Sequence, residues 1–527
     1  MLSRPLPRSV LPVAACALLL AGCSSPALAP AASPGASPAP TQTTEEEPAS
    51  PTLPPRDSVV VEGEINGAPV EVEVGPVVRD GELAVLRVAT TATGAEDVNL
   101  GGALGFAFTD LGRVAPDAVR LVDAAGRTVA LMAHDADGTR ATEVDDLRAR
   151  AGEGPATFHA LFAAPSGDTT AVLIPHVGFV PDVPVVADGP VGAADVAAVI
   201  DAQPAGLVAP VRALDSYREI AGGTVRAREV GQRTTVGITT DVLFADDSAD
   251  LSPDADSALA AAGAELAGVE AGELVVVGHT DDVGTPAHNA DLSRRRAQAA
   301  ATRLGELVDL THFDVTVEGR GSDEPAVPGT SDEARAANRR VELVFASAKR
   351  PGTDPAVASE GAHPEAVGAV GGAAEGVVVT YREDEVRVTV ESVRRVGKVL
   401  VGELRLERVG GERGTMPWPV SQTALDARGE FSPQLQFAAT GVTLLAGNER
   451  VFPLDYLVSD EDDSYRHPLA ELTVADPLDV GDTDTVTVVW PDIGADTVTL
   501  DLPRVALVGG LVEAGAAWRI TDVPVEE

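Results

Sequence analysis

Alternating apolar and polar residues begin at position 58 and predict β-strands. Two valine-rich runs, 59–61 and 70–74, flank Asn66-Gly67, a dipeptide that tolerates the positive φ angles of a tight hairpin turn. Further apolar runs, separated by Gly, Asp and Pro, lie at 83–88, 119–122, 158–162 and 171–174. Short strands at this spacing predict a β-sandwich domain over residues 58–190, followed by an Ala, Val and Gly-rich connection over 191–230.

The hydrophobic period changes from two to about 3.6 residues in the region 231–347. A strand is predicted at 236–244, after which Ser252-Pro253 supplies an N-cap and a proline suited to the first turn of a helix. The buried stripe of this helix is predicted to be Leu259, Ala262, Leu266 and Val269. A buried strand ending at Gly278, a helix from about Asp291, and strands at 315–318 and 341–345 follow. The order β-α-β-α-β-β predicts a compact α/β sandwich.

The last region, 376–527, repeats features of the first after a Pro, Gly and Ala-rich linker over 348–375. Valine-rich runs at 377–379 and 386–390 flank a turn at Glu383-Asp384, as in the opening hairpin. Asp168-Thr169 precedes Pro175-His176-Val177, and Asp496-Thr497 precedes Pro503-Arg504-Val505 at the same interval. We predict an α+β multidomain fold in which two duplicated β-sandwich domains flank the α/β sandwich, although alternating Val and Thr can also produce such echoes by chance.

The first residues predict export and a lipid anchor. Arg4 and Arg8 precede an apolar run at 10–20 that is too short to span a bilayer, which is typical of a secretory signal. Leu20-Ala21-Gly22-Cys23 resembles a bacterial lipobox, which implies removal of residues 1–22 and acylation of Cys23. An ordinary signal peptide with an incidental cysteine is the alternative. Residues 23–57, dominated by Ala, Pro, Ser and Thr, predict a disordered spacer.

Location follows from these segments. No later segment has the uninterrupted apolar length of a membrane span, so a lipid anchor is expected instead. We predict an extracytoplasmic protein anchored to the plasma membrane, on the basis of the Ala, Val and Asp-rich composition. The outer membrane is the alternative in a cell that has one.

Composition limits the possible partners. The chain carries 81 acidic and 39 basic residues, a formal charge of −42, which disfavours nucleic acid and anionic lipid as partners of the surface as a whole. Both cysteines, Cys16 and Cys23, lie in the first two dozen residues. The folded body therefore has no internal disulfide and no cysteine metal site.

Charged residues around the buried strand predict a pocket. Asp281 follows that strand, and the next helix has one row at steps of four: Leu292, Arg296, Ala300 and Leu304. An arginine in an apolar row needs a partner, because a buried guanidinium loses its hydration, and Asp281 is the nearest obvious candidate. Either the two side chains bind a ligand, or they pair with each other to fasten the helix to the strand. The remaining arginines are off this row and are predicted to be solvated: Arg294, Arg295 and Arg303.

Three blocks of residues here resemble the OmpA-like C-terminal domain family. They are Gly278-His279-Thr280-Asp281 with Gly284, Asn289, Leu292-Ser293 and Arg296-Ala297; Gly319-x-Gly321 with Pro325; and Asn338-Arg339-Arg340-Val341-Glu342. The resemblance covers roughly residues 235–345. It implies non-covalent binding of peptidoglycan through the diaminopimelate of the stem peptide, so that the chain would tether a membrane to the wall.

The resemblance also implies roles for individual residues. Asp281 would hold the ammonium group of the ligand, and Arg296 would hold its carboxylate bidentately. Gly284 would permit a tight backbone path beside the ligand. The residues that would line or support the pocket are Asn289, Arg339, Thr280 and Asp247.

The motifs that would support catalysis or metal binding are weaker. His279, Asp281 and His288 are the nearest metal or acid-base set, but no convincing third ligand motif accompanies them. Ser293 has no histidine base at a recognisable spacing. The acidic runs 246–250 and 460–463 lack regular calcium-ligand spacing. We predict no enzymatic activity, no metal and no cofactor. The alternative is an envelope enzyme, or a solute-binding or partner-binding lipoprotein, that uses the OmpA-like part only for localisation.

Overall fold

The computed structural model divides the chain into two units, Met1–Leu53 and Pro54–Glu527. It describes residues 58–527 except for 66, 106–115, 145–146, 188–194, 270, 328, 347–361, 382–383, 412–437, 458–465, 471–478 and 504–516. The predicted signal, Cys23 and the spacer therefore lie outside the described residues, as do Asn66, Glu383, Arg504-Val505 and the acidic run 460–463. Within the described part, no helix combines the length and apolar character needed to cross a membrane.

The first region forms one continuous sheet of ten strands. Its order is β12-β6-β5-β10-β11-β2-β3-β9-β7, with β1 paired to β2. The strands are β1 (Val59–Ile65), β2 (Ala68–Asp80), β3 (Leu83–Ala92), β5 (Arg120–Asp123), β6 (Thr128–Ala130), β7 (Thr142–Val144), β9 (Ala156–Ala163), β10 (Thr169–Ile174), β11 (Gly178–Val186) and β12 (Val211–Ala213). Smaller elements are β4 (Val98–Asn99), β8 (Arg148–Ala149), α1 (Leu100–Ala103) and α2 (Val196–Asp201).

The predicted hairpin and the four further strands of this region are confirmed. In the hairpin, Ile65 lies opposite Ala68, so the turn has two residues, and Gly67 has a φ of 75°. Buried side chains from both halves of the sheet, such as Leu121 of β5 and Phe158 of β9, share one core. The sheet thus folds around its core as a sandwich does, but β11 joins its two halves by pairing with both β10 and β2.

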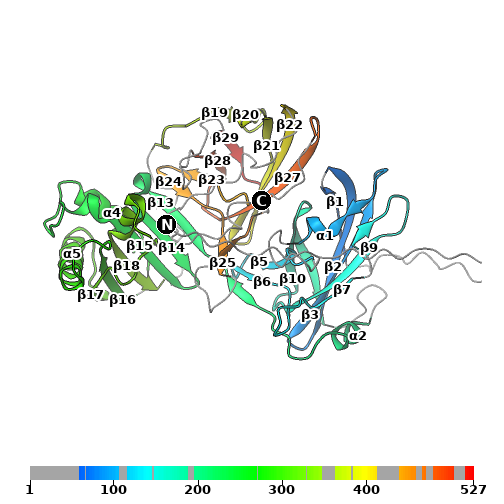
Figure 1. Cartoon of the computed structure of the whole chain (residues 1–527), viewed down its shortest axis with the longest axis horizontal. Helices are drawn as coiled ribbons and strands as arrows, with labels where there is room; N and C mark the ends of the chain where they lie inside the picture. The colour runs from blue at the N-terminus through cyan, green and yellow to red at the C-terminus, as the bar shows by residue number, and fades with distance from the viewer. Residues whose placement is uncertain are drawn as a thin grey trace, which may run out of the picture. The chain divides into compact units, whose positions relative to one another are not determined.

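The central region has helices against a mostly antiparallel sheet. The strand order is β17-β16-β18-β15-β14-β13, and β17 runs parallel to β16. The elements are β13 (Ser216–Ile220), η1 (Ala221–Gly223), β14 (Val225–Val230), β15 (Arg233–Thr239), α3 (Thr240–Leu243), α4 (Ala255–Ala264), β16 (Gly272–His279), α5 (Pro286–Leu307), β17 (Phe313–Gly321), α6 (Asp332–Asn338) and β18 (Arg340–Ala346). Helices α4 and α5 pack against one face of this sheet (Figure 1). The four residues of the predicted helical stripe are all buried, but only Leu259 and Ala262 lie in α4, because the helix ends at Ala264 before Leu266 and Val269.

Several boundaries differ from the sequence expectation. The strand predicted to reach residue 244 ends at Thr239, because Thr240–Leu243 makes one helical turn in which Phe244 N donates to Thr240 O. Helix α4 begins after Asp254 rather than Ser252. Helix α5 begins at Pro286 rather than near residue 291, because Thr285 caps it.

The sequence expectation also missed elements. Helix α6 was not expected between the last two strands. The predicted connection 191–230 contains α2, β12, β13 and β14, and the last two strands extend the sheet of the central region. The signal was a period-two alternation, since Val225 and Ala227 are buried while Arg226 and Arg228 face the other side.

The last region has two sheets around one core. One sheet is β20-β21-β22-β27, and the other, which continues from β13, is β24-β23-β28-β29-β19. The strands are β19 (Ala369–Gly372), β20 (Val377–Tyr381), β21 (Asp384–Val396), β22 (Val399–Gly410), β23 (Thr443–Ala446), β24 (Glu449–Val451), β27 (Thr483–Pro491), β28 (Thr497–Leu502) and β29 (Trp518–Pro524), beside a small pair formed by β25 (Asp455–Leu457) and β26 (Arg466–Pro468). Buried Trp490 and Trp518 belong to the shared core. Strand β19 lies in the predicted linker 348–375.

The first and last regions share details of pairing. In β10 and β11, Thr169 lies opposite Pro184 and the register shifts after Thr170. In β28 and β29, Thr497 lies opposite Pro524 and the register shifts at the equivalent place, after Val498. Each second strand also holds an aspartate in the left-handed region, Asp182 with a φ of 54° and Asp522 with a φ of 59°. Non-glycine residues seldom adopt that conformation.

Candidate functional site

The candidate site lies where three strands of the central sheet have their ends. Because β18 is antiparallel to both β15 and β16, its first residue, Arg340, lies opposite Thr239 at the end of β15, and Val341 lies opposite Gly278 near the end of β16. Chain segments that leave or enter these strands therefore meet at one edge. They carry Asp241, Asp281 and Arg339.

Arg339 joins two carboxylates at this edge. Its Nη1 donates to Asp281 Oδ2 at 3.0 Å, while Nε and Nη2 donate to the two oxygens of Asp241 at 2.9 Å and 2.7 Å. The hydrogen bonds from Arg339 hold the pKa of Asp241 below its ordinary value, and the same bonds raise the pKa of Arg339. Two carboxylates share one guanidinium, so this cluster carries a net negative charge.

The backbone around Asp281 is held from two sides. Asp281 Oδ1 accepts a hydrogen bond from Val283 N at 3.0 Å, and Asn289 Nδ2 donates to the Asp281 carbonyl at 3.3 Å. Gly284 has a φ of 107°, and a Cβ there would lie 2.9 Å from Asn289 Oδ1. A side chain at position 284 would therefore both strain the backbone and press on Asn289. The structural role expected for Gly284 follows from this geometry.

Arg296 lies on the buried face of α5, as the helical row predicted. The residue is 5% exposed. Its Nε donates to the carbonyl of Ser248 at 2.8 Å, and its guanidinium lies 5.5 Å from the ring centre of Phe244. Burial lowers the pKa of Arg296, while the nearby carboxylates of Asp241, Asp247 and Asp246 oppose this shift.

The direct pair between Asp281 and Arg296 is wrong. Asp281 pairs with Arg339, and no carboxylate among the described residues lies within ion-pair distance of Arg296. The reason is topological: β18 delivers Arg339 to the carboxylate from an adjacent strand, which the sequence separation of 58 residues conceals. A buried guanidinium without a carboxylate partner is left beside a cluster with excess negative charge.

Thr280 and His279 are also buried, and both have partners within the protein. Thr280 is 5% exposed and its N donates to Gly321 O at 2.9 Å. His279 is 1% exposed, with Nε2 at 3.4 Å from Glu342 Oε2. Burial would raise the pKa of Glu342, but its contacts with His279 and Arg340 outweigh burial and lower that pKa to about 2.

Asp247 and His288 pair at the rim of the site. His288 Nε2 lies 3.0 Å from Asp247 Oδ1, and both side chains are exposed. The three residues considered as a metal or acid-base set thus have different neighbours: His279 faces Glu342, Asp281 faces Arg339, and His288 faces Asp247. Within the part of the chain that the structure describes, no three His, Cys, Asp or Glu residues form a metal-binding group.

Glycines of the family motif set how closely α5 approaches the sheet. A Cβ at Gly278 would lie 2.1 Å from Ser293 O, and one at Gly319 would lie 2.5 Å from Arg294 N. Ser293 Oγ accepts a hydrogen bond from Gly321 N at 3.0 Å. These contacts fix the height of α5, and with it the position of Arg296, above the strand ends.

The sequence analysis missed two participants. Asp241 was placed inside a strand, whereas it lies in α3 and faces Arg339. Arg335 of α6 forms a two-fold contact with Asp282, at 2.7 Å and 3.3 Å, beside the site. The run Thr239-Thr240-Asp241 after an apolar strand was the available signal for Asp241, because a polar group directly after a buried strand tends to lie at a sheet edge.

Comparison with protein families matches residues 243–339 to the OmpA family. The chain therefore contains an OmpA-like domain, as the motif resemblance indicated, and Asp281, Arg296 and Arg339 all lie within the matched range. Comparison with curated proteins found no match.

Solved structures similar to this chain align with about a quarter of it or less. The cell wall anchor of the T6SS from Pseudomonas aeruginosa is 34% identical over 23% of this chain and 87% of that chain, with a TM-score of 0.21. A putative MotB-like protein from Desulfovibrio vulgaris is 28% identical over 23% and 81%, with a TM-score of 0.21. The peptidoglycan-associated lipoprotein from Burkholderia pseudomallei is 26% identical over 20% and 86%, with a TM-score of 0.17.

Proposed function

We propose that this protein is a lipid-anchored component of the cell envelope that binds peptidoglycan non-covalently through diaminopimelate of the stem peptide, and so tethers a membrane to the wall. The observation that carries the proposal is the state of Arg296. Its guanidinium is buried, makes one hydrogen bond to a carbonyl, and has no carboxylate partner among the described residues. Buried charges are ordinarily paired, so a ligand carboxylate is the partner this site lacks.

The charges of the site suit a zwitterionic ligand. Asp241 and Asp281 share Arg339, which leaves that cluster one negative charge in excess, while Arg296 supplies one positive charge. The ammonium group of the ligand binds beside Asp281, and its carboxylate binds the free edge of Arg296. An amino acid centre such as that of diaminopimelate carries both groups a short distance apart. Lysine in the same position of a stem peptide lacks the carboxylate.

Other residues matched to the family support these two contacts. Asn289 positions the loop through the Asp281 carbonyl, and Arg339 holds the carboxylate of Asp281 in place. Asp247 offers a further carboxylate at the rim, with His288 as its present partner. Thr280 contributes through its backbone rather than its buried hydroxyl.

The anchor and the flanking regions complete the proposal. Acylation at Cys23 and a spacer over 23–57 would hold the described regions at the outer face of a plasma membrane. In a cell that has an outer membrane, they could instead lie at the inner face of that membrane. The matched registers of β10–β11 and β28–β29 support a duplication of the sandwich regions. Replacement of Cys23 by Ser is expected to abolish incorporation of labelled palmitate and to release the protein from membranes. Retained labelling would show that the lipid is attached to another residue, and an absence of labelling in the unaltered protein would exclude a palmitoyl anchor.

Sedimentation with purified sacculi tests the wall contact. Arg296→Ala and Asp281→Ala are each expected to weaken binding about tenfold or more, because each removes a charged hydrogen-bond partner. Arg295→Ala is the matched control, since Arg295 is the neighbouring residue on α5, is half exposed and pairs with Asp291. If Arg296→Ala sediments as the unaltered protein does, the site assignment is wrong. Release of soluble muropeptides would instead indicate an enzyme.

Competition tests the diaminopimelate specificity. A stem tetrapeptide with meso-diaminopimelate at its third position is expected to displace the protein from sacculi. The same peptide with lysine at that position, whose α-amino and α-carboxyl groups are in peptide bonds, is not. Equal displacement by both would show that the second carboxylate is not recognised. Binding to sacculi that neither compound displaces would place the wall contact outside this pocket.

A further inference from the structure

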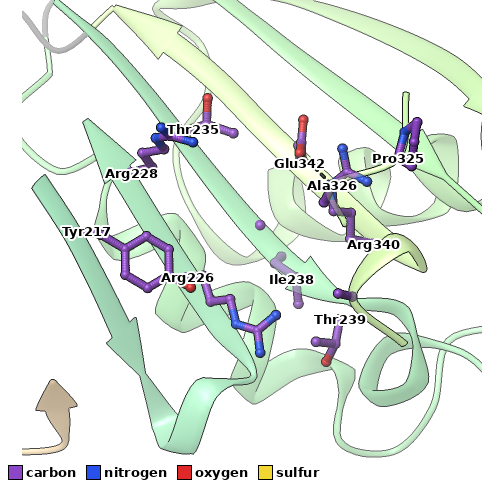
Figure 2. A pocket seen from close by; sticks show the side chains of 12 residues that line it. Tyr217, Arg226, Arg228, Thr235, Ile238, Thr239, Pro325, Ala326, Arg340 and Glu342 are labelled. Atoms are coloured by element: carbon purple, nitrogen blue, oxygen red, sulfur yellow. Dashed lines mark hydrogen bonds and ion pairs between the residues drawn. The ribbon is translucent and has the colours of Figure 1, made fainter. Parts of the chain in front are cut away.

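A cavity lies on the face of the central sheet opposite to the one that α4 and α5 cover. Its volume is about 320 Å³, and its walls come from β13, β14, β15, β18, α6 and the segment before α6. Figure 2 shows the side chains around it. Helices α4 and α5 pack on the opposite face, against Val236, Ile238 and Leu343. We call this space the rear cavity.

A glycine creates the hollow. Strand registers place Arg226 opposite Gly237, and Gly237 opposite Glu342, so these three residues form one row across the sheet. A Cβ at Gly237 would have only the Arg226 carbonyl nearby, at 4.0 Å. Adjacent strands are about 4.8 Å apart, so the row leaves a gap of roughly 10 Å between the backbones that carry the arginine and the glutamate. A small molecule fits above the glycine.

The two ends of this row differ in how their charges are used. Arg340 donates to Glu342 Oε1 at 2.6 Å and to two backbone carbonyls, and Glu342 also faces His279, so that end is satisfied within the protein. Arg226 has only a distant carboxylate, with Nε at 3.6 Å from Glu219 Oε1. That Nε is buried and donates no hydrogen bond. Buried donors are nearly always hydrogen-bonded, so an acceptor is expected here.

The surroundings of Arg226 favour an anion with a small apolar part. Arg228 lies two residues further along β14 on the same face, and Figure 2 shows Arg226 extending toward Thr239 with the ring of Tyr217 on its other side. Pro325 and Ala326 form the wall near Arg340, and they offer apolar surface without charge. The planar guanidinium of arginine can donate two parallel hydrogen bonds to a carboxylate, which the ammonium group of lysine cannot do.

The rear cavity is separate from the site at the strand ends. Side chains alternate between the two faces of a sheet, so Arg340 faces the cavity while its neighbour Arg339 holds Asp281 and Asp241. Thr239 lines the cavity, and the chain then turns into α3. A ligand in the rear cavity therefore does not touch Asp281 or Arg296.

We propose that the rear cavity binds the carboxylate of a small, partly apolar acid of the class of N-acylated amino acids, with Arg226 as the principal contact and Gly237 as the floor. The carboxylate supplies the acceptor that Arg226 Nε lacks, and the apolar part rests on Pro325 and Ala326. This inference does not depend on the function proposed for Asp281 and Arg296. The end of a peptide in the wall and a free acylated amino acid share this chemistry.

Calorimetric titration of the full chain with N-acetyl-alanine tests the proposal. Saturable binding is expected, weakened about tenfold or more by Arg226→Gln and only partly by Arg226→Lys, which keeps the charge. Gly237→Leu is expected to abolish binding by filling the cavity, and Gly237→Ala to reduce it without a clash. Arg296→Ala is expected to leave binding unchanged. Circular dichroism and thermal unfolding show whether each variant is folded.

Several outcomes overturn the proposal. The first is an absence of saturable binding of N-acetyl-alanine to the unaltered protein. The second is binding by Arg226→Gln or Gly237→Leu that equals that of the unaltered protein. The third is a loss of affinity in Arg296→Ala as large as that in Arg226→Gln. Tighter binding of inorganic phosphate than of N-acetyl-alanine would replace the carboxylate assignment. If Gly237→Leu does not fold, the variants Gly237→Ala, Arg226→Gln and Arg226→Lys still test the proposal. Displacement of N-acetyl-alanine from the Arg296→Ala variant by intact sacculi would identify the wall as the source of the ligand, and an absence of displacement would favour a free acid.

Discussion

Arg339 Nη1 donates a hydrogen bond to Asp281 Oδ2 at 3.0 Å, so the carboxylate expected to bind ligand is held by the arginine that immediately precedes the neighbouring strand, β18. The same guanidinium also binds Asp241. Arg339 therefore keeps two carboxylates together at the edge of the sheet, and Arg296 has no acidic partner among the residues that the structure describes. The ammonium group of the proposed ligand would bind the cluster with excess negative charge, and its carboxylate would bind Arg296.

Replacement of Arg339 by Gln is expected to destabilise the protein by about 1 to 2 kcal/mol, because two neighbouring carboxylates lose their shared cation. The loss should shrink at high salt, which screens the remaining repulsion. Urea unfolding at low and high salt measures both. Arg335→Gln is the control, since Arg335 pairs with Asp282, which is more exposed than Asp281, and the change should destabilise the protein less than Arg339→Gln does. An equal effect of the two changes would contradict the special position of Arg339.

Glu342 is expected to stabilise the fold in a pH-dependent way. Its pKa is lowered to about 2 from an ordinary 4.5, so the folded state favours the charged carboxylate. A lowered pKa contributes stability that is fully present above pH 4.5 and is lost as the pH falls toward 2. The difference in unfolding free energy between the unaltered protein and Glu342→Gln should therefore shrink over this window. A constant difference from pH 6 down to about pH 2 would show that His279 and Arg340 do not favour the charged form.

Replacement of Gly278 by Ala is expected to destabilise the central region by about 3 kcal/mol, or to displace α5, since overpacking of a tight core contact carries an energy of this order. The new Cβ would lie 2.1 Å from Ser293 O, which is backbone and can move only with the helix. Gly272→Ala in the same strand is the matched control, because nothing lies within 4 Å of its Cβ. Thermal unfolding measures both variants. Similar midpoints would mean that α5 does not rest on Gly278.

Loss of the cap of α5 is expected to loosen the site without removing a ligand contact. Thr285 accepts a hydrogen bond from His288 N at 3.3 Å, and Thr285→Ala should lower stability by about 1 kcal/mol. Hydrogen exchange should increase first in the opening turn of α5, which carries His288 and Asn289. Thr285→Ser keeps the oxygen and should restore most of the stability. An unchanged exchange pattern in Thr285→Ala would contradict the cap.

Local sequence signals identified most strands and the buried face of α5, because alternation and the 3.6-residue period record which side chains face the core. They failed where a short element interrupts a pattern. Val242, Leu243 and Phe244 continue the apolar pattern of the strand, yet the chain turns into α3, where Thr240 N donates a backbone hydrogen bond to Arg339 O. Arg339 is distant in sequence, so no local rule could reveal that hydrogen bond.

By itself the sequence determined that Arg296 lies on the buried face of a helix, that Asp281 follows a buried strand, and that both belong to an OmpA-like domain. It could do so because helical period, strand burial and motif spacing are local properties of the chain. Only the tertiary structure decided that Arg339, rather than Arg296, pairs with Asp281, and that Gly237 opens a cavity beside Arg226. Both depend on strand register across the sheet, which brings residues from separate segments within hydrogen-bonding distance.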